Sequence, residues 1–229
     1  MFRIKNLNGI TKSVYNLEDE AEYVLHSKII TEIGHTLLAK EFRDFEVDDY
    51  NAKILRFLLL YFNNCQMAET IFPDENYKVH KQIMIIGKIG VGKTMLMQIF
   101  SEYLRITDNP NQFVNISITE MTNYFKIYNH LDKYIYNELS ELKARKSNAC
   151  NYCLNDLGLL TYNHFGVDTK LIIDDFLYAR YELFIAHDKK AHITTNLSVS
   201  ELKTLYDARI IDRFKSYNIL QFDGTSRRK

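Results

Sequence analysis

Three of the eight glycines in this chain lie within one short segment, which also contains a lysine and a threonine. Positions 87–94 read GKIGVGKT and match the pattern G-x-x-x-x-G-K-[ST] in full. The segment follows an apolar run at 82–86, expected to be a strand, and precedes a helical pattern. Glycines let backbone N–H groups approach phosphate oxygens, and the N-terminus of the following helix favours an anion. The sequence therefore predicts a phosphate-binding loop between a strand and a helix.

The residues of this loop have separate roles in holding a nucleotide. Lys93 is expected to reach the β- and γ-phosphates of ATP, and the Thr94 hydroxyl is expected to ligate Mg²⁺. The expected nucleotide-binding residues are those of the whole loop and its helix start: Gly87, Lys88, Ile89, Gly90, Val91, Gly92, Lys93, Thr94 and Met95. The expected cofactors are therefore ATP and Mg²⁺.

The pattern of apolar residues changes at about residue 82. Before it, the intervals between apolar residues predict helices, and after it short apolar runs alternate with helical stretches. Such alternation is typical of a parallel α/β sheet. We expect a small helical region at 1–70 and a P-loop α/β domain at 71–229, with a RecA-like parallel five-stranded sheet and flanking helices. The expected helices are 17–38, 51–62, 94–104, 119–146, 170–186 and 198–214, and the expected strands are 82–86, 112–118, 152–155, 192–195 and 217–222.

A nucleotide-hydrolysing site of this kind also needs an acid at the end of a second strand. Two segments compete for this role, one containing Asp156 and the other containing Asp174 and Asp175. We favour Asp156, because a strand before Asp174 would interrupt a helical face that continues to Phe184. Asp174 and Asp175 are then expected to be solvated charges on a helix.

Composition narrows the class of partner and the compartment. Lys plus Arg and Asp plus Glu both total 29, so the formal net charge is zero and there is no bulk positive field for nucleic acid or an anionic membrane. No apolar stretch typical of a signal peptide follows the N-terminal residues. The apolar run 57–62 is far shorter than the roughly 20 residues of a membrane span. We expect a cytoplasmic protein that does not enter a membrane.

The cysteines and histidines do not predict a metal site. Cys150 and Cys153 have C-x-x-C spacing, but no second pair supplies the four ligands of a zinc site. We therefore expect both cysteines to be structural and reduced, as is usual in that compartment. His192 begins an expected strand and is interpreted as structural.

From Lys81 onward, over about 150 residues, the sequence resembles the AAA+ ATPases of the DnaC/IstB type. This family comprises bacterial and phage helicase loaders and transposition helpers. The matching segments are GKIGVGKT at 87–94, LNDLG at 154–158, ITTNLS at 193–198, YDARIIDRF at 206–214 and FDGTSRR at 222–228. The resemblance implies an AAA+ fold and an ATPase activity.

The resemblance also implies roles for single residues. Asn196 falls at the sensor-1 asparagine of the family, whose amide orients water near the γ-phosphate. Arg209 and Arg213, which lie on one helix face, match arginines that reach the nucleotide of a neighbouring subunit, so self-association is implied. Surface ion pairs with acids nearby are the alternative. Arg227 and Arg228 match a sensor-2 element, or form only a basic tail.

One position departs from the family pattern. The family carries two acids before Leu-Gly, whereas this chain has Asn155 followed by Asp156. Asp156 takes the place of the catalytic acid, and Asn155 that of the acid that helps to hold Mg²⁺. An amide contributes no charge to a metal site, so we expect ATP hydrolysis to be slow.

The resemblance implies a function in DNA replication. The zero net charge argues against tight, ATP-independent coating of DNA, because such coating needs many phosphate contacts. The expected function is that of a DnaC-like helicase loader, for a phage or mobile element, in which residues 1–70 dock a replicative helicase. An IstB-like transposition helper, or a nucleotide-binding scaffold with little hydrolysis, are the alternatives. Contact with single-stranded DNA is expected to be weak, with 143–146 as a candidate site.

Overall fold

The structure is a computed structural model that describes residues 15–136, 149–158 and 168–228. Within these residues five strands form one sheet, in the order β2-β3-β4-β1-β5, and every neighbouring pair is parallel. This confirms the parallel five-stranded sheet expected from the sequence. The strands are β1 (Gln82–Ile86), β2 (Phe113–Ser117), β3 (Asn151–Leu157), β4 (Ala191–Thr195) and β5 (Tyr217–Gln221).

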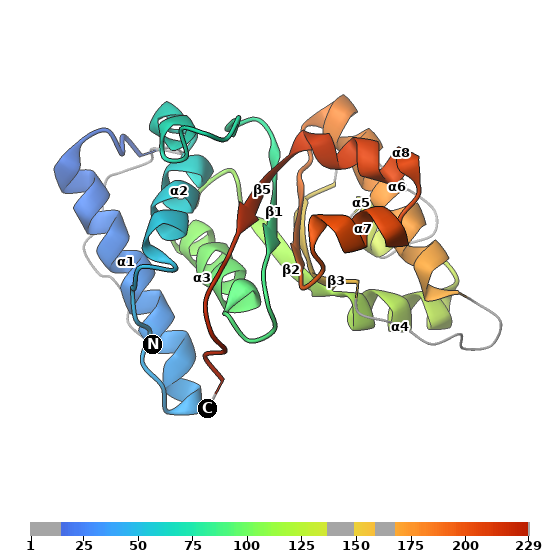
Figure 1. Cartoon of the computed structure of the whole chain (residues 1–229), viewed down its shortest axis with the longest axis horizontal. Helices are drawn as coiled ribbons and strands as arrows, with labels where there is room; N and C mark the ends of the chain where they lie inside the picture. Colours follow the sequence, from blue (N-terminus) through green and yellow to red (C-terminus); the bar gives the residue numbers. More distant parts are fainter. Residues whose placement is uncertain (1–14, 137–148, 159–167, 229) are drawn as a thin grey trace.

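Helices cover both faces of the sheet, which makes a three-layer α/β protein (Figure 1). One face carries α1 (Glu20–Leu38), α2 (Ala52–Phe62) and α3 (Lys93–Ile106). The other carries α4 (Ile118–Tyr128), α5 (Asp132–Tyr136), α6 (Thr169–His187), α7 (Val199–Leu205) and α8 (Ala208–Arg213). Short 3-10 helices lie at Ala39–Glu41, Gln66–Thr70 and Phe214–Ser216.

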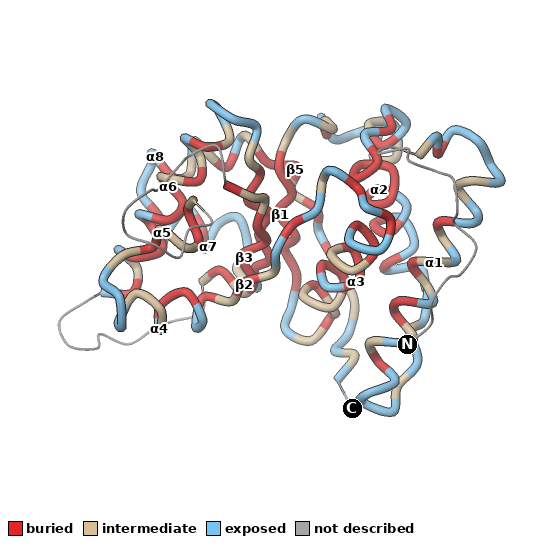
Figure 2. The backbone as a smooth tube through the Cα atoms, turned by 180° about the vertical axis from the view of Figure 1, so that it is seen from behind, coloured by how far each residue is buried: buried red, intermediate tan, exposed pale blue. Residues whose placement is uncertain are grey.

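The side chains of β1 alternate between two apolar clusters. Ile83 and Ile85 belong to the cluster that contains residues of α1, α2 and α3. Met84 and Ile86 belong to the cluster that contains residues of α4 to α8. Figure 2 shows buried residues along the strands and on the inward sides of the helices. A strand covered on both faces needs apolar residues at consecutive positions, which is why 82–86 is a continuous apolar run.

The N-terminal helices pack into the first of these clusters. α2 buries every residue from Phe57 to Phe62, and α1 begins at the Asp19 cap, whose carboxylate accepts a hydrogen bond from the N–H of Glu22. The Tyr103 hydroxyl of α3 lies 2.8 Å from Nδ1 of His26 in α1. Both expected N-terminal helices are therefore present, and α1 reaches the rest of the domain mainly through α3. The division of the chain at residue 70 stays a prediction.

Two expected helices are interrupted. The helix expected over 119–146 ends at Tyr128, because Asn129 adopts a left-handed conformation with φ 55°. α5 follows after a short turn, and 137–148, which include the candidate DNA site 143–146, lie outside the described residues. The helix expected over 198–214 is two helices, since the backbone is extended at Tyr206 and Asp207 caps α8 with its carboxylate.

The two acidic segments have the secondary structure that the sequence predicts. Asp156 lies in β3, and Asp174 lies within α6. The expectation that Asp174 is solvated is wrong. Only 8% of Asp174 is exposed, and its carboxylate pairs with Lys170 one turn earlier. Burial raises the pKa of Asp174, although the hydrogen bond from Lys170 opposes this. Asp175 is exposed, as expected.

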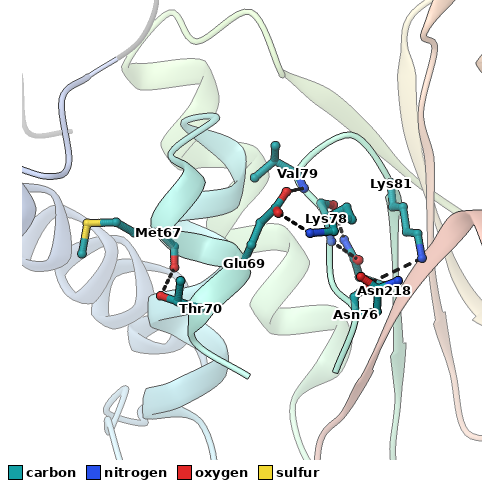
Figure 3. Close-up of polar contacts among 8 residues, drawn as sticks. All are labelled: Met67, Glu69, Thr70, Asn76, Lys78, Val79, Lys81 and Asn218. Atoms are coloured by element: carbon teal, nitrogen blue, oxygen red, sulfur yellow. Dashed lines mark hydrogen bonds and ion pairs between the residues drawn. The ribbon is translucent and has the colours of Figure 1, made fainter. Parts of the chain in front are cut away.

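The connector between α2 and β1 is tied to the edge of the sheet (Figure 3). Glu69 accepts from the Lys78 ammonium at 2.6 Å and from the N–H of Val79 at 3.0 Å. The side chain of Asn218 in β5 accepts from the N–H of Lys78 and donates to its carbonyl, both at 2.8 Å. These bonds hold the connector beside β5, the edge strand, and set the point at which the chain enters β1.

Cys153 is buried in β3, and all three cysteines are free. Among the described residues no group of three or more His, Cys, Asp and Glu side chains could hold a metal ion. His192 is buried in β4, where Nδ1 accepts the N–H of Ile83, so it has the structural role expected. In the described part of the chain no helix is both long and apolar enough to cross a membrane.

Candidate nucleotide site

The glycine-rich loop lies at the carboxyl ends of two adjacent strands whose following helices go to opposite faces. The chain passes from β1 into α3 on one face and from β4 into α7 on the other. Such a switch point leaves a crevice in which open α/β sheets bind ligands. Gly92, the residue before α3, has φ 108°, which side-chain-bearing residues rarely adopt. The loop can therefore turn directly into the helix.

A cavity of about 890 Å³ opens at this crevice. Its wall includes the loop and helix start from Ile89 to Leu96, which contains all of the expected binding residues from Ile89 to Met95. Asp156 and Asn196, from the ends of β3 and β4, also line it. The structure thus brings Lys93, Thr94, Asp156 and Asn196 to one cavity, as the sequence predicts for a nucleotide site. Gly87 and Lys88, which were also expected to bind the nucleotide, do not line the cavity, and their carbonyl groups accept hydrogen bonds from Lys93.

Lys93 is held in place by three acceptors. Its ammonium donates to the carbonyls of Gly87 at 2.7 Å and Lys88 at 2.9 Å, and to Oδ1 of Asn196 at 2.6 Å. Burial lowers the pKa of Lys93. The negative charge of Asp156 raises this pKa, and the positive charge of Arg228 lowers it further. An ammonium has three N–H donors, and all three are used here. A phosphate must therefore replace one of these acceptors to bind Lys93.

Asp156 adopts an unusual backbone conformation where β3 ends. Its φ is 62°, and its N–H donates to the Thr194 hydroxyl of β4 at 3.1 Å. Left-handed backbone costs energy at an aspartate, so it persists only where surrounding contacts hold it. The bond to Thr194 is one such restraint. The carboxylate of Asp156 is partly exposed and lines the same cavity as Thr94.

Asn155 does not line the cavity. It is only 4% exposed, and its amide nitrogen donates to Oδ1 of Asn115 in β2 at 3.1 Å. Its amide oxygen accepts from the Thr194 hydroxyl at 3.2 Å. Both ends of the amide are thus used to join three neighbouring strands. The structure therefore separates Asn155 from the other residues proposed to hold Mg²⁺.

Arg209 and Arg213 lie on α8 and do not line the cavity of their own chain. The guanidinium of Arg213 lies over the ring of Tyr178, 4.1 Å from its centre, and 5.0 Å from that of Tyr181. Arg209 is exposed, and neither arginine forms an ion pair with a described residue. The contact of either residue with a neighbouring subunit stays a prediction.

Two further segments complete the cavity. One is the segment 41–51 between α1 and α2, and the other is the segment 222–228 after β5. Arg227 joins them through an ion pair with Asp48, with 2.6 Å between Nη2 and Oδ2. Sequence reasoning found Arg227 and Arg228 only through the family resemblance. It missed Arg43 and Asp48, because no local pattern marks residues that meet through long-range packing.

No protein-family model matches the chain, and no curated protein matches its sequence. Solved structures do match. The chain aligns over 78% of its length with AMPPCP-bound DnaA from Aquifex aeolicus, at a TM-score of 0.52 and 16% identity, and spans 48% of that protein. It aligns over 78% of its length with the DnaC helicase loader, at a TM-score of 0.52 and 17% identity, and spans 93% of it. The chain therefore has the α/β P-loop fold of the AAA+ ATPases DnaA and DnaC.

Proposed function

We propose that this chain binds ATP and Mg²⁺ in the cavity at the glycine-rich loop and uses the nucleotide to control its binding to a replicative helicase. The observation that carries the proposal is the meeting of Lys93, Thr94, Asp156 and Asn196 at one cavity. These residues come from the start of α3 and the ends of β3 and β4, and together they supply a phosphate-binding cation, a hydroxyl, an acid and an amide. That set matches the requirements of nucleotide binding and hydrolysis.

The phosphates would lie against the backbone of the loop and the N-terminus of α3, where N–H groups and the helix dipole favour an anion. Lys93 would exchange one of its present acceptors for a phosphate oxygen. The partner released most readily is Asn196, because its amide is exposed and its bond to Lys93 joins two side chains. Binding of the γ-phosphate would thus free the Asn196 amide to orient water, the role that the family resemblance implies.

Two of the three residues expected to hold Mg²⁺ are suited to do so. The Thr94 hydroxyl and the Asp156 carboxylate line the same cavity, and both are the oxygen ligands that Mg²⁺ prefers. The metal would neutralise charge on the phosphates when bound. The Asn155 amide is already used within the sheet and carries no charge. This supports slow hydrolysis, and it also favours the second candidate, a nucleotide-binding scaffold with little turnover.

The helicase partner rests on the fold shared with the DnaC helicase loader. Residues 1–70 are the proposed docking region, in which α1 exposes Val24 and Leu25. A transposition helper would use the same nucleotide site with a different partner. Self-association would place Arg209 or Arg213 near the nucleotide of the next subunit, and DNA contact would be weak in the absence of ATP.

The test compares wild type with Lys93→Ala. We expect wild type to bind ATP and to co-purify with a replicative helicase in a manner that differs between ATP and a non-hydrolysable analogue. Lys93→Ala should lose most of its ATP affinity, as measured by calorimetric titration, and should lose the nucleotide dependence of helicase binding. A variant that binds ATP normally and still responds to it would contradict the proposal. Capture of a transposase instead would favour the transposition helper.

A further inference from the structure

The segment 222–228 lies against the glycine-rich loop. The N–H of Arg227 donates to the carbonyl of Gly90 at 2.9 Å. Ser226 fills the space beside Gly90, where a Cβ atom would lie 2.3 Å from its hydroxyl oxygen. A Cβ atom on Gly92 would lie 3.7 Å from Cδ of Arg227. The side chain of Arg227 therefore passes directly beside the residue that precedes Lys93, where a phosphate would bind.

The same arginine is held from the other side by the segment 41–51. Its guanidinium pairs with Oδ2 of Asp48, and its carbonyl accepts a hydrogen bond from Arg43. The other oxygen of Asp48, Oδ1, accepts the N–H groups of Tyr50 at 3.0 Å and Asn51 at 3.1 Å, in the turn before α2. One carboxylate oxygen thus fixes the turn and the other holds Arg227. In Figure 1 the segment after β5 runs from the sheet toward the end of α1, as these contacts require.

The charges around the cavity make this pair sensitive to a bound anion. Arg43, Lys93, Arg227 and Arg228 all line the cavity. Guanidinium groups bind phosphate strongly because their planar N–H donors match its oxygens. The side chains of Arg227 and Asp48 are 27% and 36% exposed, so their pair is partly screened by water and is not fixed by burial. A phosphate group beside Gly92 would repel the Asp48 carboxylate and attract its partner.

We propose that Asp48 competes with the bound nucleotide for Arg227, so that a nucleoside triphosphate engages Arg227 by breaking the ion pair with Asp48, whereas a diphosphate leaves this pair intact. This inference rests on the proposed binding of a nucleotide in the cavity. A triphosphate brings a further charged group to the loop and takes over the guanidinium of Arg227. A diphosphate does not displace Asp48, so it gains little from Arg227 and does not bear the cost of breaking the ion pair.

The test measures dissociation constants for ATP and ADP, with Mg²⁺, in wild type and Asp48→Asn. Asparagine keeps Oδ1 for the turn before α2 and removes the charge that holds Arg227. We expect ATP to bind about fivefold more tightly in Asp48→Asn, because it no longer has to break a partly exposed ion pair, and ADP to gain less. The preference for ATP should therefore rise.

Two controls make the result specific. Asp49→Asn makes the same chemical change one residue away, at an exposed side chain that does not line the cavity, and should leave both constants unchanged. Asp48→Asn introduced into Arg227→Ala should have no further effect, because the arginine for which Asp48 and the nucleotide compete is absent. Thermal unfolding of each variant reports whether the turn before α2 is intact.

Each other outcome overturns the inference. Weaker binding of both nucleotides to Asp48→Asn would mean that the carboxylate positions Arg227 for the ligand and does not compete with it. An equal response of Asp49→Asn would reveal a general effect of charge. Unchanged constants in Asp48→Asn, with tight ATP binding to wild type, would refute the competition between Asp48 and the nucleotide alone. A wild-type protein that binds neither nucleotide would refute the proposed function as well.

Discussion

At the scale of single residues, the site combines side chains whose roles the sequence predicts with others whose roles depend on the fold. Lys93 and Thr94 belong to a contiguous motif, so their place beside the cavity follows from the loop itself. Asn155 is adjacent to Asp156 in the chain, yet successive residues of a strand point to opposite sides. The structure therefore gives these neighbours different surroundings, with Asp156 at the cavity and Asn155 inside the sheet.

Replacing Asn155 by aspartate should increase ATP turnover by roughly tenfold, equivalent to about 1.4 kcal/mol in the barrier. An aspartate cannot donate to Asn115 as the Asn155 amide does, so its carboxylate would be released from the sheet and could supply the charge that the family pattern places beside the metal. Phosphate release under saturating ATP measures the effect, with ATP affinity determined in parallel. Equal and rapid turnover in both proteins would show that an acid at this position is dispensable.

His192 should make the protein less stable in acid. Burial lowers the pKa of His192 well below its usual value, and the charges of Lys190 and Arg180 act in the same direction. Below about pH 6.5 the unfolded chain therefore binds a proton that the folded protein does not, so stability falls as the pH falls. His192→Asn keeps an acceptor for the N–H of Ile83 and removes this titration.

Chemical denaturation at several pH values tests this expectation. Between about pH 6.5 and 5, wild type should lose up to about 1.4 kcal/mol per pH unit more than His192→Asn. Above pH 7 the difference between the two proteins should be constant. Parallel losses of stability below pH 6.5 would mean that another group, such as His26, is responsible.

At the scale of elements, local periodicity predicted most helices and strands but not their interruptions. α6 was predicted because its apolar face continues without a break, and β1 because it is a short apolar run beside the glycines. The breaks at Asn129 and Asp207 depend on a left-handed residue and on a capping carboxylate. Both residue types also occur inside helices, so the sequence does not show which conformation they adopt.

The packing of α2 on the sheet layer predicts that this helix contributes strongly to stability. Leu58 is fully buried in α2, within the same apolar cluster as residues of α3. Leu58→Ala should lower the free energy of unfolding by about 3 kcal/mol through lost contacts and a cavity. Leu25→Ala on α1, where 51% of the side chain is exposed, should change it by less than about 0.5 kcal/mol. Urea denaturation compares the two variants.

At the scale of the whole molecule, distant segments meet in ways that motif recognition does not capture. Segments 41–51 and 222–228 lie far apart in the chain, yet both line the cavity. Their contacts depend on where α1 ends and where β5 leaves the sheet. The glycine-rich loop could be predicted from eight contiguous residues, whereas the contact between these two segments follows only from the complete fold.

The proposed subunit contact belongs to this scale as well. With ATP bound, we expect the chain to self-associate, and Arg209→Ala should reduce both association and turnover without changing thermal stability, since Arg209 is exposed and unpaired among the described residues. Arg213→Ala should also lower stability, by about 1 kcal/mol, because its guanidinium stacks on Tyr178 and Tyr181. Analytical ultracentrifugation with and without ATP measures association. Full assembly of Arg209→Ala would exclude this residue from the interface.

The packing of α1 and α2 beside α3 also limits how the chain can be divided. Removing residues 15–62 would expose Ile99, Phe100 and Tyr103 of α3, which are completely buried in the whole protein. A fragment that retains only the glycine-rich loop and the sheet would therefore carry a large apolar surface and tend to aggregate. Experiments that distinguish a helicase from a transposase partner accordingly need the complete chain with substitutions on the outer side of α1, because a deletion would damage the nucleotide site at the same time.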